Sequence, residues 1–177
     1  MPPELLDARY PIGKFQRPSS PSPDDRLSAI AVLADLPSHL RNAVDDLDHA
    51  QLGTPYRDGG WTVRQLVHHI ADSHTNAVIR IKLALTEDWP TIKLYDEKSW
   101  AILHDAAAPV EWSLNLIEAL HARWVMLLQS LDEAQWQRGF RHPENGRMSV
   151  ELATALYAWH SRHHTAHITH LRQREDW

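Results

Sequence analysis

The chain of 177 residues contains no cysteine, which excludes disulfide bonds and any metal site built on thiolates. No apolar run approaches the length of a membrane-spanning helix, and no apolar segment near the start resembles a secretion signal. We therefore expect a cytoplasmic protein with no membrane partner. The formal net charge is −5 and no basic stripe stands out, which argues against nucleic acid as a partner. Any metal site must use nitrogen and oxygen ligands.

Histidine, by contrast, is abundant, with 13 residues in the chain. Five of them fall in the segment WHSRHHTAHITH, residues 159–170. This segment is the strongest chemical signal in the sequence, because imidazole is both a common metal ligand and a common acid or base.

Four long segments carry apolar residues at spacings of three and four, which predicts four helices. The expected bounds are roughly 24–47, 62–85, 112–131 and 149–174. Thr62 begins a capping-box pattern with Gln65, and Ser149 is a plausible N-cap of the last helix. Pro37 either kinks the first helix or starts a second one.

The segments between these helices contain no convincing strand. Residues 96–104 could form a short helix, and 137–148 could hold a short hairpin around Asn145-Gly146. We therefore predict an all-α protein, a four-helix bundle with antiparallel packing as the default. The middle connection, 86–111, is long, so the topology need not be simple up-and-down.

The domain organisation is expected to be simple. Residues 1–23 contain six prolines and predict an irregular N-terminal arm. Residues 24–177 would form the bundle, so that the whole chain, 1–177, is one domain.

The histidines of the last helix continue its apolar stripe. Residues His160 and His164 differ by about 40° around the axis of an α-helix, so that both side chains can reach one point. His163 and His167 fall on the same stripe, whereas His170 lies off it and should face solvent. Close imidazoles disfavour each other's protonation, and a cation that takes their lone pairs removes that conflict.

The second helix offers three more histidines, and periodicity alone does not choose among them. His74 lies on the apolar face, where a hydrogen-bonded core histidine is the favoured interpretation. His69 lies at the edge of that face, with Asp72 placed to orient it, and His68 should face solvent. His121 falls on the inward stripe of the third helix and could line the same cavity.

Several stretches resemble the YfiT-type metal-dependent hydrolases, a group within the DinB-like superfamily whose relatives include bacillithiol S-transferases. The resemblance covers nearly the whole chain and is carried by YPIGKF (10–15), TPYRDGGW (54–61), GGWTVRQLVHHIADSH (59–74), YDEKSW (95–100) and LYAWHSRHHTAHI (156–168). It implies a four-helix bundle, a homodimer, and one divalent metal held by three histidines on two helices.

The resemblance also assigns the ligands. The first family histidine stands eight residues after the tryptophan that opens the second helix, and Trp61 places it at His69. The other two are the first and last positions of H-x-x-H-H, which are His160 and His164. His163 is then a neighbour of the site and not a ligand.

Three neutral histidines leave an open coordination position, as in catalytic zinc sites, although nickel or iron would also suit imidazole. The expected function is a metal-dependent hydrolase that uses an activated water on a small-molecule substrate. The first alternative is an S-transferase for a low-molecular-weight thiol of the bacillithiol or mycothiol type. A non-catalytic metal-binding or sensing protein, or a structural dimerisation module, would also fit.

Two functional details stay open in the sequence. No general base can be named. The loop residues Tyr56, Arg57 and Asp58 could hold a substrate, or could form a tight turn with a salt bridge.

Overall fold

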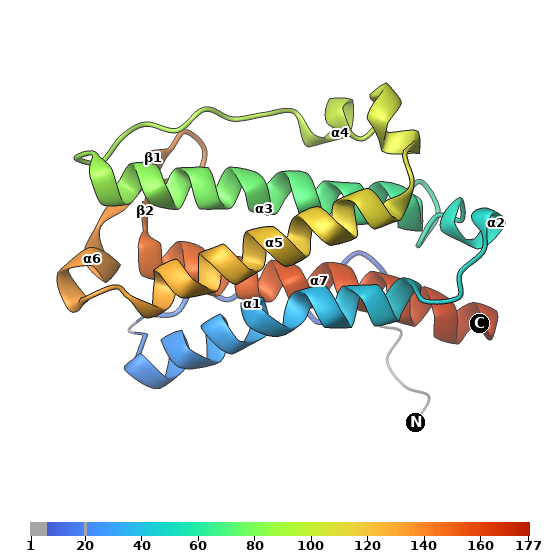
Figure 1. The fold of residues 1–177 in the computed structure, drawn as a ribbon, viewed down its shortest axis with the longest axis horizontal. Coiled ribbons are helices and arrows are strands. Elements are labelled where there is room, and N and C mark those ends of the chain that lie inside the picture. Colours follow the sequence, from blue (N-terminus) through green and yellow to red (C-terminus); the bar gives the residue numbers. More distant parts are fainter. Residues whose placement is uncertain (1–6, 20) are drawn as a thin grey trace.

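The computed structural model describes residues 7–19 and 21–177, so that residues 1–6 and 20 of the expected proline-rich arm lie outside the described chain. Four long helices form a bundle, which confirms the predicted fold class (Figure 1). They are α1 (Pro23–Val44), α3 (Val63–Thr86), α5 (Val110–Gln129) and α7 (Val150–Glu175).

Local capping chemistry fixes where the two histidine-bearing helices begin. The Thr62 side chain accepts a hydrogen bond from the Gln65 amide at 3.2 Å, and the Gln65 side chain accepts one from the Thr62 amide at 3.0 Å. The Ser149 hydroxyl accepts from the Leu152 amide at 3.1 Å at the start of α7. Both predicted caps are confirmed. Because a helix start sets which residues share a face, these caps fix the directions of the histidines that follow.

The first helix continues through its internal proline. Pro37 lies inside α1, which is a single helix, so that the alternative of a second helix starting there is wrong. Its ring removes one main-chain hydrogen bond. The helix nevertheless buries one side on both sides of the proline, from Ile30 and Leu33 to Leu40 and Val44.

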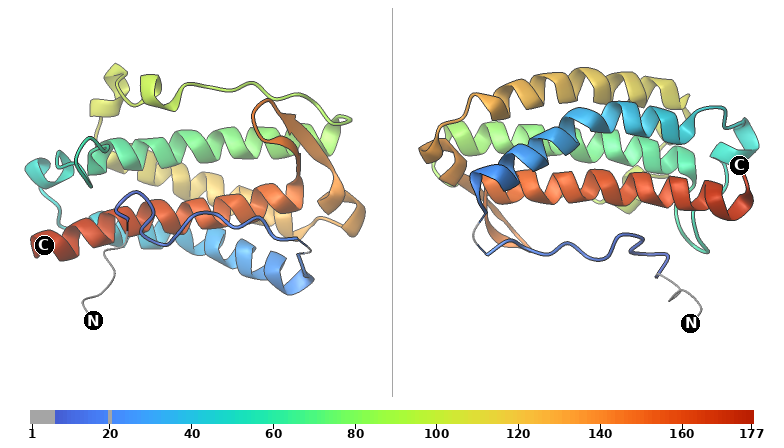
Figure 2. Two further views of the ribbon diagram at one scale, coloured as in Figure 1. Left: turned by 180° about the vertical axis from the view of Figure 1, so that it is seen from behind. Right: turned by 90° about the horizontal axis from the view of Figure 1, so that it is seen from below.

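The four helices do not alternate in direction. Figures 1 and 2 show α1 and α7 running one way and α3 and α5 running the other. Helix α1 packs against α7 and α5, and α3 packs against α5 and α7. The consecutive helices α3 and α5 are therefore parallel neighbours. The bundle departs from the antiparallel default, as the length of the middle connection indicated, because the chain must return along α3 before α5 can begin.

The remaining elements are short. Helix α2 (His49–Leu52) and helix α6 (Glu133–Gln137) were not predicted. The expected helix at 96–104 is divided into α4 (Glu97–Trp100) and a 3-10 turn, η1 (His104–Ala107). The hairpin is present as β1 (Gly139–His142) and β2 (Gly146–Ser149), and its register pairs His142 with Gly146.

The apolar core is split into two clusters along the bundle. On α3, one cluster ends at Ala71 and the other begins at Ala77; on α7, the gap runs from Tyr157 to Ile168. Most of the buried histidines occupy this gap, so that a polar layer crosses the middle of the core. In the described part of the chain, no helix is both long enough and apolar enough to cross a membrane.

Candidate metal centre

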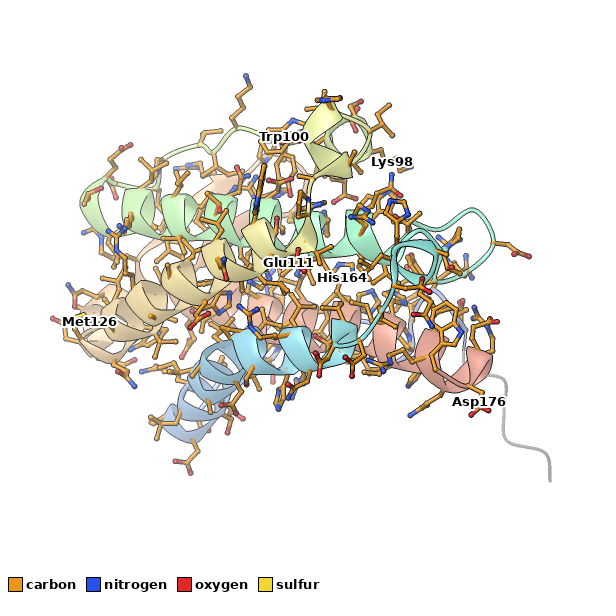
Figure 3. All side chains as sticks on the ribbon, turned by 45° about the vertical axis from the view of Figure 1, so that its right-hand side comes forward. Lys98, Trp100, Glu111, Met126, His164 and Asp176 are labelled. Carbon is orange, nitrogen blue, oxygen red and sulfur yellow. The ribbon has the colours of Figure 1, made fainter. Side chains whose placement is uncertain are left out.

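The three histidines assigned as ligands come together inside the bundle. His69 on α3 and His160 and His164 on α7 each offer one ring nitrogen, and these atoms lie within 4.8 Å of one another. The Nε2 atoms of His69 and His160 are 3.3 Å apart. The His164 ring centre is 4.3 Å from that of His160 and 5.0 Å from that of His69. Figure 3 places His164 in the interior, between the helices. We call these three residues the triad.

Each member of the triad is held by its position in a helix. His160 and His164 are one turn apart on α7, so that their side chains project from the same face. His69 reaches the same point from the facing helix α3. Its ring packs on Trp61, with ring centres 4.5 Å apart, and Trp61 directly precedes the N-cap of α3. The cap that starts the helix and the aromatic ring that covers His69 are thus neighbours in sequence.

The donor atoms fit a divalent cation. Two nitrogens 3.3 Å apart subtend about 104° at a cation about 2.1 Å from each, which is close to the tetrahedral angle of zinc sites. The Nδ1 atom of His164 is buried and has no hydrogen-bond partner among the described residues. Neutral imidazole nitrogens are donors that zinc, nickel and iron accept.

The surroundings keep the triad in the form that binds metal. Burial lowers the pKa of His69 to about 4. Burial also lowers the pKa values of His160 and His164 well below the ordinary value, and the neighbouring histidines lower them further. The three imidazoles are therefore neutral near pH 7, with lone pairs available to a cation.

The two core-facing histidines predicted from the pattern are confirmed as buried. His74 is fully buried and His121 is 1% exposed. The Nδ1 atom of His74 lies 2.8 Å from Nε2 of His121, and Nε2 of His74 lies 3.0 Å from Nδ1 of His160. Both histidines therefore connect to the triad, which periodicity could not show because the contacts join different helices.

A second pair of histidines lies beside the triad on α7. The Nε2 atoms of His163 and His167 are 3.1 Å apart, and both side chains are buried. His163 stacks on Trp159 and His167 lies against Tyr56, with ring centres 4.4 Å and 4.0 Å apart. His163 lies beside the triad, and its ring nitrogen, with those of His164 and His167, forms a second group of donors within 4.8 Å of one another, so that its expected role as a neighbour and not a ligand stays a prediction. His170 is exposed, as expected.

The prediction that His68 faces solvent is wrong. Its ring is half-buried, with Nδ1 2.7 Å from the Ser113 hydroxyl and Nε2 3.1 Å from the Ala108 carbonyl. Burial lowers the pKa of His68. The physical reason is tertiary, because the segment after α4 folds over this side of α3. A helical pattern cannot show such a cover.

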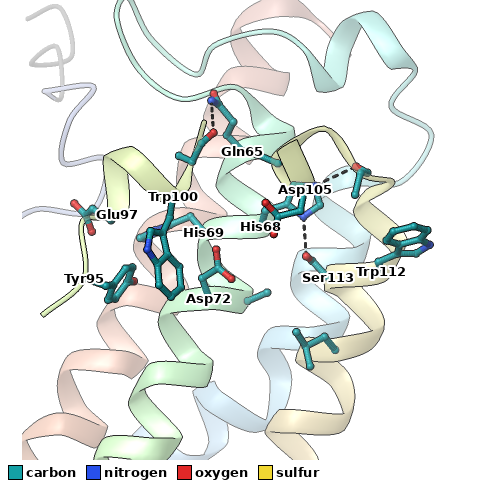
Figure 4. Close-up of a pocket in the computed structure, with 15 residues that line it drawn as sticks. Gln65, His68, His69, Asp72, Tyr95, Glu97, Trp100, Asp105, Trp112 and Ser113 are labelled. Carbon is teal, nitrogen blue, oxygen red and sulfur yellow. Dashed lines mark hydrogen bonds between the residues drawn. The ribbon is translucent and has the colours of Figure 1, made fainter. Parts of the chain in front are cut away.

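A cavity of about 190 Å³ lies beside the triad, and His69 forms part of its wall (Figure 4). Asp72 from α3 and three residues of the middle connection, Tyr95, Glu97 and Trp100, also line it. Burial raises the pKa values of Asp72 and Glu97, and it raises that of Tyr95 to about 12. The motif YDEKSW was the only sequence signal for these three residues of the connection.

Two further sequence hypotheses concern residues near the triad. Among the hydrogen bonds of the described residues, none joins Asp72 to His69, so the expected orienting contact is not found.

The loop at 56–58 is a tight turn, in which the Gly60 amide donates to the Arg57 carbonyl at 2.9 Å. Arg57 donates to the main-chain carbonyl of Asp58 at 2.9 Å, rather than to its carboxylate.

The fold and the buried imidazoles define the class of protein: a helical bundle whose facing helices bring potential metal donors into the core. The sequence profile of the DinB superfamily matches residues 33–168. The chain belongs to this superfamily, which confirms the resemblance seen in its motifs.

Similar proteins extend over almost the entire chain. A protein of Bacillus mycoides (strain KBAB4) is 53% identical over 173 residues, which cover 98% of this chain and all of the relative. One of Oceanobacillus iheyensis is 52% identical, covering 97% of this chain and all of the relative. Both are named "Putative metal-dependent hydrolase". The solved structure of YfiT from Bacillus subtilis, described as "a probable metal-dependent hydrolase with an unusual four-helix bundle topology", superposes with a TM-score of 0.94 at 49% identity and covers 96% of this chain and 98% of YfiT.

Proposed function

We propose that the protein is a metal-dependent hydrolase in which His69, His160 and His164 hold one divalent cation. Zinc is the first candidate, with nickel and iron as alternatives. The observation that carries the proposal is the 3.3 Å approach of two neutral Nε2 atoms within a cluster of three imidazoles. The names of the similar proteins support hydrolysis as the reaction class.

The residues around the triad have distinct roles in this proposal. His69, His160 and His164 would hold the cation and leave one coordination position open, and the metal would supply a water whose pKa is lowered towards about 7. The cavity lined by His69 would take the small-molecule substrate, since that histidine belongs to both the triad and the wall. Asp72 and Glu97 are candidates for the proton acceptor, because burial moves the pKa of each carboxyl group towards neutral pH.

The experiment that tests the reaction type compares turnover with and without an added thiol. The chain has no cysteine, so a thiol nucleophile would have to come from outside. The zinc-loaded protein is assayed with ester and amide substrates in buffer alone, and with an electrophilic acceptor plus bacillithiol or mycothiol. We expect turnover in buffer alone, and its loss in His160→Ala. Strict thiol dependence would establish the S-transferase instead, and inactivity in both assays would favour a metal-binding or sensing protein.

Removal of the metal is expected to lower thermal stability, because the cation would bind only the native geometry and would connect α3 to α7. Free metal at about 1,000 times its dissociation constant adds about 4 kcal/mol to the free energy of unfolding. For a chain of this size that corresponds to a shift in Tm of roughly 10 °C. Differential scanning calorimetry near pH 8, before and after a chelator, measures it. An unchanged Tm after confirmed metal loss would contradict a site that joins the two helices.

The homodimer implied by the resemblance is a further proposal. Large apolar side chains are exposed on α5 and on the connection before it, including Trp112 at 69% and Ile102 at 79%. Such side chains commonly mark protein interfaces. Sedimentation equilibrium of the wild-type protein and of Trp112→Glu would test this surface.

A further inference from the structure

A line of hydrogen-bonded imidazoles connects the main chain of α1 to the triad. It starts at the Leu33 carbonyl, which lies 2.6 Å from Nδ1 of His121. It continues from Nε2 of His121 to Nδ1 of His74 at 2.8 Å, and from Nε2 of His74 to Nδ1 of His160 at 3.0 Å. Leu33, His121, His74 and His160 belong to α1, α5, α3 and α7, so that each helix of the bundle contributes one group.

The carbonyl at the start sets the direction of every hydrogen bond in this line. A carbonyl oxygen only accepts, so Nδ1 of His121 must carry a proton and donate to Leu33. A neutral imidazole has one N–H group, and therefore Nε2 of His121 accepts from Nδ1–H of His74. By the same logic Nε2 of His74 accepts from Nδ1–H of His160. The line ends with Nε2 of His160 free of a proton, 3.3 Å from Nε2 of His69.

The packing around the line supports neutral imidazoles. His74 is fully buried, and its ring meets Trp124 and Tyr157 edge-on, with ring centres 5.8 Å and 5.2 Å away. Trp124 also packs edge-on against His121. Aromatic walls of this kind do not stabilise an extra proton as a carboxylate would. Each imidazole therefore keeps a single N–H group, as the order of donors requires.

We infer that His74 and His121 are positioning residues that hold His160 in the tautomer with Nε2 free to bind a metal. The inference rests on the proposed metal site, but the tautomer itself belongs to the metal-free protein. When a cation draws electron density from Nε2 of His160, its Nδ1–H becomes a stronger donor to His74. The hydrogen bonds from His160 through His74 to His121 would thus also raise metal affinity, as groups that accept from the second ring nitrogen of a ligating histidine commonly do.

The first test needs no substitution. In metal-free protein labelled with ¹⁵N-histidine, long-range ¹H–¹⁵N correlation spectra distinguish protonated from bare ring nitrogens. We expect His121, His74 and His160 all to carry the proton on Nδ1. A proton on Nε2 of His160 would overturn the inference. If the tautomers are as expected but no divalent cation binds, the proposed function fails while the ordered line stands.

The second test measures zinc affinity by competition with a chromophoric chelator. His74→Phe removes the acceptor for His160, and we expect binding about 10- to 100-fold weaker, the usual cost of losing such a partner. His74→Gln keeps an amide oxygen that can accept and should recover part of the affinity. His121→Phe should have a smaller effect, since the contact between His74 and His160 remains.

The control for these variants is His167→Phe, which removes another buried imidazole whose hydrogen bond goes to His163 and not to the line. Its zinc affinity should stay near that of the wild type. Unchanged affinity in a folded His74→Phe protein would overturn the inference. So would an equal loss in His74→Phe and His74→Gln, because that would indicate a role in packing alone. If His74→Phe does not fold, His121→Phe and the spectra of the wild-type protein decide.

Discussion

Replacement of His160 by alanine is expected to weaken zinc binding by roughly 100- to 1,000-fold. Structural zinc sites with four ligands have apparent binding free energies of about 10–16 kcal/mol, or about 2.5–4 kcal/mol for each ligand. Since every 1.4 kcal/mol is about tenfold in affinity, the loss of one ligand gives this range. His69→Ala and His164→Ala should behave alike, because all three nitrogens lie within 4.8 Å of one another. Metal content after dialysis and isothermal titration calorimetry both measure the effect.

Two other histidines on α7 serve as matched controls for the ligands. His170 is exposed, so that His170→Ala should leave zinc affinity unchanged. His163 directly precedes a member of the triad, but its Nε2 atom faces His167. His163→Ala should therefore weaken binding far less than His164→Ala. An equal loss in these two variants would mean that the assignment is shifted by one residue.

The metal-free protein is expected to lose most of its stability on mild acidification. A histidine has a pKa near 6.5 in the unfolded chain, whereas burial lowers the pKa values of His69 and His121 to about 4. Between these values the unfolded chain binds protons that the folded chain does not. Above about pH 6.5 these two groups therefore leave the free energy of unfolding unaffected. As the pH falls from 6.5 towards 4, proton binding to the unfolded chain decreases it.

The size of this effect follows from linkage. Each group costs about 1.4 kcal/mol per pH unit within that window, so that these two histidines together remove about 4 kcal/mol between pH 7 and pH 5. The pKa values of His74, His160 and His164 are lowered in the same sense and add to the slope. Urea titrations of the chelator-treated protein at several pH values give the free energy of unfolding. A value that is constant from pH 7 to pH 5 would contradict burial of neutral imidazoles.

Local chemistry explains which parts of the fold were predictable. The starts of α3 and α7 follow from side chains that cap their own helix, Thr62 with Gln65 and Ser149 with Leu152. Those interactions span three residues and can be read in the sequence. The directions of α3 and α5 depend instead on packing between segments far apart in the chain. For that reason the sequence indicated only that the topology was not settled.

The site also has features that the sequence predicts and features that depend on contacts between distant segments. The pairing of His160 with His164 follows from the helical repeat alone. The choice of His69 over His74 needed the family motif, because His74 is closer to the centre of the apolar face. In the structure, the central position directs His74 towards His121, and the edge position brings Nε2 of His69 close to Nε2 of His160. The cover over His68 could not be predicted, because it comes from residues beyond the end of α3.

The parallel course of α3 and α5 also affects how proteins built on this bundle can diverge. The return segment that this course requires supplies Tyr95, Glu97 and Trp100 to the cavity, whereas the triad lies entirely on α3 and α7. If the proposed function holds, part of the cavity wall can therefore vary independently of the three triad residues, although His69 and Asp72 of α3 also line it. Under that proposal, exchange of residues 87–109 between relatives would alter the cavity wall and leave the triad residues unchanged. The long connection that the parallel course of α3 and α5 requires thus contributes to the cavity and contains no residue of the triad.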